Sequence, residues 1–164
     1  MTMIKRAPVD RSSAKRQSGL AAIEFALVFV VLFLAVYGVA SIGAVLYVQQ
    51  VVSRAAEDGA RAALQLSLDV SANDSRVQSA VYQSLASSSI TPSVAGSSIA
   101  SKLAWLKNNM PSSLITVDTS SPIQVMVKVA YPYGNNPIVP ALPFTGIVLP
   151  PNLQGKATTA KPLP

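Results

Sequence analysis

The chain has 164 residues, enough for one small domain and a membrane anchor, and it is apolar: 50% of its residues are hydrophobic and only 12% are charged. It has no Cys and no His, which removes disulfides, thiolate and imidazole chemistry and the usual zinc and haem ligands, so we expect no enzyme, no cofactor and no metal site. The net charge of +6 does not indicate nucleic-acid binding, because the later basic residues are scattered singly along the chain.

A basic leader is predicted over residues 1–19, and it carries five basic residues against one acidic residue. After the following apolar run, the charges of the first four charged residues cancel; these residues are Arg54, Glu57, Asp58 and Arg61. The positive-inside rule therefore predicts that the N-terminus lies in the cytoplasm and that the C-terminal region lies across the membrane.

A transmembrane helix is predicted over the uncharged run from Phe25 to Val48. As a helix this run would be about 36 Å long at about 1.5 Å per residue. This length exceeds the thickness of the hydrocarbon core of a bilayer, roughly 30 Å. The run is also longer than the apolar region of a signal peptide, about 7–15 residues, so we expect it to remain in the protein as an anchor. Tyr47 falls where an interfacial aromatic residue is expected.

Small residues interrupt the second half of this run, and Ala40 with Ala44 forms a small-xxx-small pair that would let another helix approach closely. The alternative, that small residues are simply common in spanning helices, stays open. The candidate packing residues are Gly38, Ala40, Gly43 and Ala44.

Glu24 is a carboxylate at the start of the apolar run, and charged groups at bilayer depth are costly and usually functional. A structural reading is equally available, because head groups and the positive end of a helix dipole would both tolerate a carboxylate there.

Beyond the membrane we expect an amphipathic extension of the helix to about Leu68, with opposite charges paired at i, i+4 as Arg54–Asp58 and Glu57–Arg61. Gly59 indicates a bend or a close helix contact. A partner-binding face formed by Arg54 and Arg61 is the functional alternative to a merely solvated surface.

The remaining residues, 69–164, are predicted to form a small α+β domain. Helices are expected over about Asp74–Ala86, behind an Asn73 or Asp74 cap, and over Ser98–Asn108, where Trp105 would be a core anchor or a half-buried lid. Strands are expected at Leu114–Asp118, Ile123–Tyr131, Ile147–Leu149 and Leu153–Thr159, with a Pro-rich loop from Pro132 onward. The clean alternation from Ile123 to Tyr131 predicts that Ile123, Val125, Val127, Val129 and Tyr131 share one face.

Two segments of this chain resemble the TadE-like pseudopilins of tight-adherence (Flp-type, type IVb) pilus systems, within the wider type IV prepilin group. The first is the junction Lys15-Arg16-Gln17-Ser18-Gly19-Leu20-Ala21-Ala22-Ile23-Glu24-Phe25. The second is the alanine-rich stretch Val51–Ala63, in which Arg54, Gly59 and Arg61 match the family's pattern. The resemblance covers about residues 15–64.

The resemblance implies a pilin-like subunit that a prepilin peptidase cleaves after Gly19, leaving Leu20 as the new N-terminus. Glu24 and Phe25 would then be the fifth and sixth mature residues, and Glu24 would pair with the freed amine of Leu20 during assembly. The implied partners are that peptidase, other pilins or pseudopilins, the membrane platform and the membrane itself. Leu20 stands where many type IV pilins have Phe, so N-methylation cannot be inferred.

The sequence thus predicts three segments: a cytoplasmic leader (1–19), a transmembrane helix with its extension (20–68) and a periplasmic α+β domain (69–164). The implied function is a minor pilin or pseudopilin of a bacterial inner membrane that supports adherence and biofilm formation. Whether it enters the filament or only primes assembly stays open, as does the strand order. The alternative is an unprocessed single-pass protein whose outer domain binds a ligand or partner.

Overall fold

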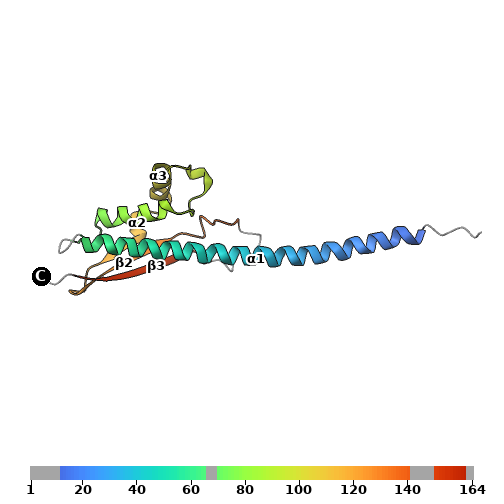
Figure 1. Cartoon of the computed structure of the whole chain (residues 1–164), viewed down its shortest axis with the longest axis horizontal. Coiled ribbons are helices and arrows are strands. Elements are labelled where there is room, and N and C mark those ends of the chain that lie inside the picture. The colour runs from blue at the N-terminus through green and yellow to red at the C-terminus, as the bar shows by residue number, and fades with distance from the viewer. Residues whose placement is uncertain (1–11, 66–69, 141–149, 162–164) are drawn as a thin grey trace, which may run out of the picture. The chain divides into compact units, whose positions relative to one another are not determined.

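The computed structural model describes the backbone of residues 12–65, 70–140 and 150–161. The chain divides into two units, Met1–Ser41 and Ile42–Pro164, and each is considered by itself. Helix α1 (Ser12–Gln65) supplies all of the described part of the first unit and the first element of the second (Figure 1).

The first unit exposes its large apolar side chains from Leu20 to Val39. Of the described helices, α1 alone has the length and the hydropathy to cross a membrane, within Gly19–Gln65, and its most apolar window is not buried at all. A core helix of a soluble domain would hide such a surface. The apolar composition therefore makes α1 a candidate membrane helix, as the sequence predicts.

In the second unit the last turns of α1 are amphipathic. The buried positions recur at three- and four-residue spacing, which places them on one face of the helix. They are Val48, Val52, Ala55, Ala56, Gly59, Ala60 and Ala63. The predicted extension of the helix is therefore confirmed as far as Gln65, and its apolar face is part of the core of this unit. The predicted residues from there to Leu68 lie outside the described residues.

Helices α2 (Ser75–Ser87) and α3 (Ile99–Asn109) match the two predicted helices within one residue at each end. Each begins at a predicted polar residue, because the Asp74 carboxylate accepts a hydrogen bond from the Arg76 N–H and the Ser98 hydroxyl accepts one from the Ser101 N–H. Two single-turn helices, η2 (Ser93–Ala95) and η3 (Ser112–Leu114), flank α3. Trp105 is half-buried against the core, as expected.

The sheet has three antiparallel strands in the order β1-β2-β3, which the sequence had left open. The strands are β1 (Ile115–Asp118), β2 (Gln124–Tyr131) and β3 (Leu153–Ala160). The central strand β2 pairs through Val127 with Val117 on one side and with Ala157 on the other. The fold is therefore α+β, a long apolar helix followed by short helices and an antiparallel sheet, as predicted.

Alternation in β2 is confirmed for Val125, Val127, Val129 and Tyr131, which are all buried. Ile123 is the exception, with 64% of its surface exposed. It lies just before the first paired residue, Gln124, so the pleat of the ladder does not fix its direction. The predicted strand at Ile147–Leu149 lies outside the described residues.

Glycines allow the closest approaches to α1. A Cβ on Gly155 of β3 would lie 2.7 Å from the carbonyl carbon of Val52 and 2.8 Å from the Cα of Ser53, so the strand's backbone touches the helix's backbone. The Gln49 side-chain amide donates a hydrogen bond to the Gln154 carbonyl, 2.7 Å away. These contacts fix β3 along the C-terminal half of α1.

Candidate anchor and assembly site

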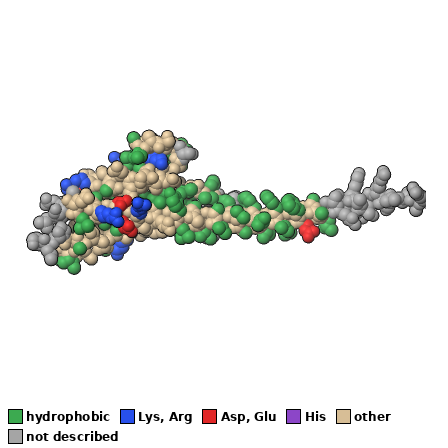
Figure 2. Space-filling view, viewed as in Figure 1, with side chains coloured by type: hydrophobic (Ala, Val, Ile, Leu, Met, Phe, Trp, Pro, Cys, Tyr) green, Lys and Arg blue, Asp and Glu red, His purple; other side chains and the backbone are tan. Residues whose placement is uncertain are grey.

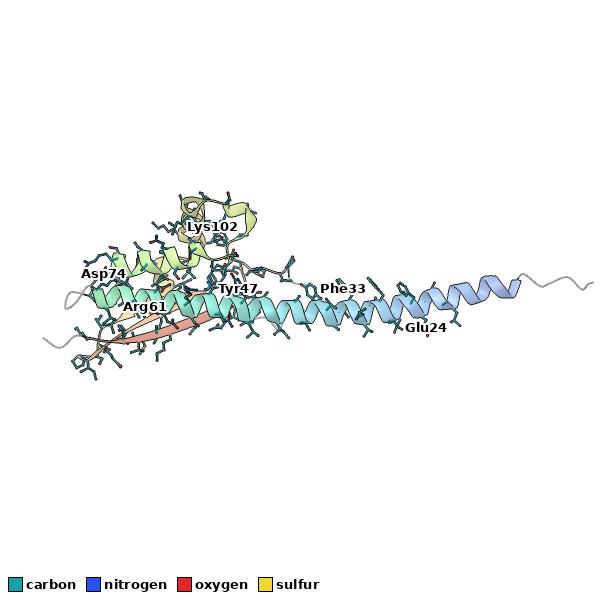
Figure 3. The ribbon with its side chains drawn as sticks, viewed as in Figure 1. Glu24, Phe33, Tyr47, Arg61, Asp74 and Lys102 are labelled. Carbon is teal, nitrogen blue, oxygen red and sulfur yellow. The ribbon has the colours of Figure 1, made fainter. Side chains whose placement is uncertain are left out.

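The junction singled out in the sequence lies within α1. Gly19, Leu20, Glu24 and Phe25 are all helical and exposed, and the structure brings no side chain against Gly19. In Figure 3 Glu24 projects from the apolar part of α1. Among the described residues no ion pair involves Glu24, so this carboxylate stands by itself on an apolar surface.

The helix-dipole explanation for Glu24 does not hold for the uncleaved chain. Helix α1 begins at Ser12, about three turns before Glu24, and the favourable field of a helix N-terminus fades within the first turn. Removal of residues 1–19 would make Leu20 the start of the helix, and Glu24 would then lie about one turn from the new terminal amine. The geometry thus connects the role of Glu24 to the state of the N-terminus.

An aromatic ladder runs along the anchor. Phe25, Phe29, Phe33 and Tyr37 follow one another at four-residue spacing, and successive ring centroids lie 6.1, 6.4 and 6.1 Å apart in stacked orientation (Figure 3). The spacing places all four rings on one face of the helix. Of this set only Phe25 was predicted as a site residue, although the i, i+4 recurrence of aromatic residues is visible in the sequence.

Phe25, Phe29 and Phe33 keep 71%, 55% and 49% of their surfaces exposed, so stacking does not cover these three rings. In water such a surface would be unfavourable, whereas lipid tails or another apolar helix would cover it at no such cost. At the predicted packing residues Gly38 and Gly43 no described atom lies within 4 Å of the position that a Cβ would take. Ala40 is exposed and Ala44 is half-buried.

The post-membrane residues lie on two different sides of α1. Gly59 faces the core, where a Cβ would stand 2.7 Å from Val81 Cγ2 and 3.2 Å from Val127 Cγ1, which confirms the predicted close helix contact. Arg54 and Arg61 lie on the exposed side. Figure 2 shows charged side chains gathered over this part of α1.

The predicted i, i+4 ion pairs differ from those observed. Asp58 accepts a hydrogen bond from the Ser84 hydroxyl of α2 at 2.6 Å, and the nearest guanidinium to it is that of Arg61, at i, i+3 and 3.9 Å. Because Asp58 is drawn toward α2, its carboxylate does not pair with Arg54. The prediction failed because a tertiary contact outweighed a weak local pair.

An open groove of about 480 Å³ lies between α1 and α2 in the second unit. Arg54, Asp58 and Ser84 form its charged and polar wall. Tyr47 lies at its other end, where the Ser89 N–H donates a hydrogen bond to the tyrosine hydroxyl at 3.3 Å. The groove provides hydrogen-bonding groups, among them the paired Ser84 hydroxyl and Asp58 carboxylate.

Comparison with known proteins identifies the class of the anchor region. Residues 19–61 match the family model described as TadE-like protein, and this match confirms the resemblance on which the sequence analysis relied. It begins at Gly19, runs through the apolar helix and ends at Arg61. Neither the curated proteins nor the solved structures gave a match.

The matched segment therefore includes the candidate junction, the aromatic ladder and the charged side of α1. Residues 19–61 are thus similar to TadE-like proteins, and together with the candidate membrane helix this match fits a pilus-related membrane protein.

Proposed function

We propose that the chain is a minor pilin or pseudopilin of a tight-adherence (Flp, type IVb) pilus, cleaved by a prepilin peptidase after Gly19. The observation that carries this proposal is the family match beginning at Gly19, followed five residues later by the exposed carboxylate of Glu24 at the start of the uncharged part of α1. Its role is structural rather than catalytic. Adherence and biofilm formation would follow from pilus assembly.

The proposed topology is a single pass through the bacterial inner membrane, with the leader in the cytoplasm and residues 69–164 in the periplasm. The five basic residues of the leader and the balanced charges from Arg54 to Arg61 support this orientation. Cleavage on the cytoplasmic side would remove the leader and its charge while leaving the anchor in place.

Cleavage after Gly19 requires local unwinding, because Gly19 and Leu20 lie inside α1 and a protease cleft accepts an extended backbone. Glycine lowers the cost of this step, since it disfavours a helix interior by about 1 kcal/mol relative to alanine. The absence of any side chain against Gly19 leaves the junction accessible.

After cleavage the amine of Leu20 would be a positive charge at the start of the helix, and Glu24 would lie about one turn away. We propose that the Glu24 carboxylate pairs with this amine, on its own chain or a neighbouring subunit. An unpaired carboxylate transferred into an apolar filament core would be destabilising by several kcal/mol, so the pair would select the correct register of packing.

The proposed partners are the prepilin peptidase, another pilin or pseudopilin and the membrane assembly platform. The ladder of Phe25, Phe29, Phe33 and Tyr37 and the small residues Gly38 to Ala44 offer apolar contact surfaces for a second helix. The exposed side of α1 with Arg54 and Arg61 offers a polar one.

A second candidate function is an unprocessed single-pass protein whose outer domain binds a ligand or an envelope partner. The groove between α1 and α2 is the observation that favours it, because its charged wall is open to solvent. In that case the leader would remain attached, and Gly19 and Glu24 would have no special role.

The test of the assembly role compares Glu24→Gln with Glu57→Gln, which removes the same charge from the exposed side of α1. We expect Glu24→Gln to abolish or strongly reduce pilus assembly while the protein is still inserted and cleaved, and Glu57→Gln to assemble normally. Surface pili and membrane-fraction protein are measured in the same cells. Normal pilus assembly in the Glu24→Gln variant would contradict the proposed role of Glu24.

A further inference from the structure

In the second unit several exposed apolar residues lie outside α1. Val94 of η2 keeps 91% of its surface exposed, Ile99 at the start of α3 keeps 54%, and Ile138 in the loop after β2 keeps 39%. Val94 in particular makes no contribution to the core. Exposed apolar residues that gather on one side of a small domain mark an interaction surface, whereas single ones are normal, so the position of these residues decides what they mean.

Hydrogen bonds and shared hollows connect these residues to the part of α1 around Tyr47. The Ser89 N–H binds the Tyr47 hydroxyl at 3.3 Å, and residues 87–88 line the same groove as Tyr47. A second hollow of about 420 Å³ is lined jointly by residues 89–92 and 135–138, and the Ala95 N–H binds the Pro92 carbonyl at 2.9 Å. The turn with Val94 and the loop with Ile138 thus lie near the part of α1 that carries Tyr47.

Tyr47 lies at the end of the uncharged apolar run, where the membrane interface is expected. Within this unit Ile42 and Leu46 are exposed apolar residues of α1, and they continue the candidate membrane surface up to Tyr47. In Figure 1 the yellow-green turn before α3 lies on the side of α3 toward these first turns. The exposed apolar residues of η2 and α3 are therefore placed near the level at which α1 would leave a bilayer.

The charge of this region also suits a lipid surface. No acidic residue occurs between Asp74 and Asp118, whereas α3 carries Lys102 and Lys107. The Lys102 ammonium donates to the Ser88 carbonyl at 3.4 Å, which holds it beside the segment that contacts Tyr47 (Figure 3). Apolar side chains next to lysines are typical of surfaces that bind anionic lipid head groups.

We propose that η2, the start of α3 and the loop carrying Ile138 dock on the bilayer surface next to the anchor. Val94 and Ile99 enter the head-group region, and Lys102 faces lipid phosphates. Docking holds the domain against the membrane before assembly and must be released when the subunit leaves the bilayer. The inference rests on α1 spanning the membrane, as in the proposed function.

The test uses the full chain in vesicles of phosphatidylcholine with or without phosphatidylglycerol. The protein has no cysteine, so Val94→Cys, Ile123→Cys and Leu34→Cys each introduce a single labelling site for an environment-sensitive fluorophore. Ile123→Cys is the matched control, because Ile123 is also an exposed aliphatic residue but lies at the β1–β2 turn. Quenching is measured from lipid-attached doxyl groups and from aqueous iodide.

We expect the Val94 label to be quenched from the lipid and protected from iodide, and the Ile123 label to show the reverse. In vesicles with phosphatidylglycerol, Lys102→Gln and Lys107→Gln should each lower the ratio of docked to undocked protein by about fivefold. In vesicles of phosphatidylcholine alone, the same substitutions should leave this ratio unchanged. Quenching of the Val94 label by iodide would overturn the proposal. A Val94 label that neither iodide nor the lipid-attached groups quench would also overturn it, because the label would then be covered by protein. Lipid quenching at Leu34 separates these outcomes from a failure of the anchor itself.

Discussion

Asp74 shows how one side chain sets the start of a helix. Its carboxylate accepts hydrogen bonds from the Arg76 N–H at 2.9 Å and from the Arg76 guanidinium at 3.1 and 3.2 Å. These hydrogen bonds to Arg76 hold the pKa of the Asp74 carboxyl below its usual value of 3.8. Because the unfolded chain then binds a proton at higher pH than the folded chain, Asp74 stabilises the fold above that value, and this contribution is lost as pH falls through the folded pKa.

The matched variant is Asp74→Asn, which keeps a capping oxygen but cannot titrate. We expect the wild type to melt at a higher temperature than Asp74→Asn at neutral pH, and the difference to shrink toward zero well below pH 3.8. Thermal unfolding in detergent, followed by circular dichroism across pH, measures this. A melting difference that is independent of pH would contradict the assigned role.

Gly155 is the residue whose substitution should be most damaging to the second unit. A Cβ there would meet backbone atoms of Val52 and Ser53 at 2.7 and 2.8 Å, and backbone atoms cannot rotate away as a side chain can. We expect Gly155→Ala to lower the free energy of unfolding by about 3 kcal/mol, the upper end of the usual range for overpacking.

Gly43→Ala is the control for Gly155→Ala, because a Cβ at Gly43 meets nothing within 4 Å. Chemical denaturation of both variants in detergent gives the comparison. Equal stability of the two variants would show that β3 does not pack against α1 as described. An assembly defect in a normally stable Gly43→Ala would instead support the predicted helix packing.

Among the elements, the packing of α1 against α2 and β2 depends on the missing side chain at Gly59. Alanine there would gain about 1 kcal/mol of helix propensity. That gain is smaller than the cost of pushing a Cβ against Val81 Cγ2 at 2.7 Å, since overpacking costs about 1–3 kcal/mol. The two effects can be separated by removing the obstructing methyl groups.

We therefore expect Gly59→Ala to destabilise the wild type and to become neutral or stabilising in a Val81→Ala background. The double-mutant cycle should show a coupling of more than about 1 kcal/mol, typical of residues in contact. Denaturation of the four proteins under the same conditions measures it. Simple additivity would mean that α1 and α2 are farther apart than the structure has them.

Elements with strong local signals could be predicted from the sequence. Helix α2 followed from its apolar spacing and its Asp74 cap, and β2 from its alternation. Features that depend on distant parts of the chain could not be predicted. The Asp58–Ser84 hydrogen bond replaced a local ion pair, and the strand order required the pairing of β3 with β2. The exposure of Ile123 arose because the strand begins one residue later.

At the scale of the whole molecule, the two units have opposite surfaces. From Leu20 to Val39 the first unit exposes nearly every large apolar residue, whereas the second buries a core of valine, alanine, leucine and tyrosine. The candidate site was largely visible in the sequence, because the junction and the post-membrane motif are local patterns in one helix. The aromatic ladder was missed as a set, and the groove between α1 and α2 arises only from tertiary packing.

The central claim is that the mature protein begins at Leu20, and it is tested most directly by the intact mass and N-terminal residue of the protein from its own membranes. The measurement is made with and without the cognate prepilin peptidase. We predict a start at Leu20 only when the peptidase is present, with the full leader retained otherwise. A start at Met1 or Thr2 in both strains would contradict the account and would leave a membrane-tethered binding module.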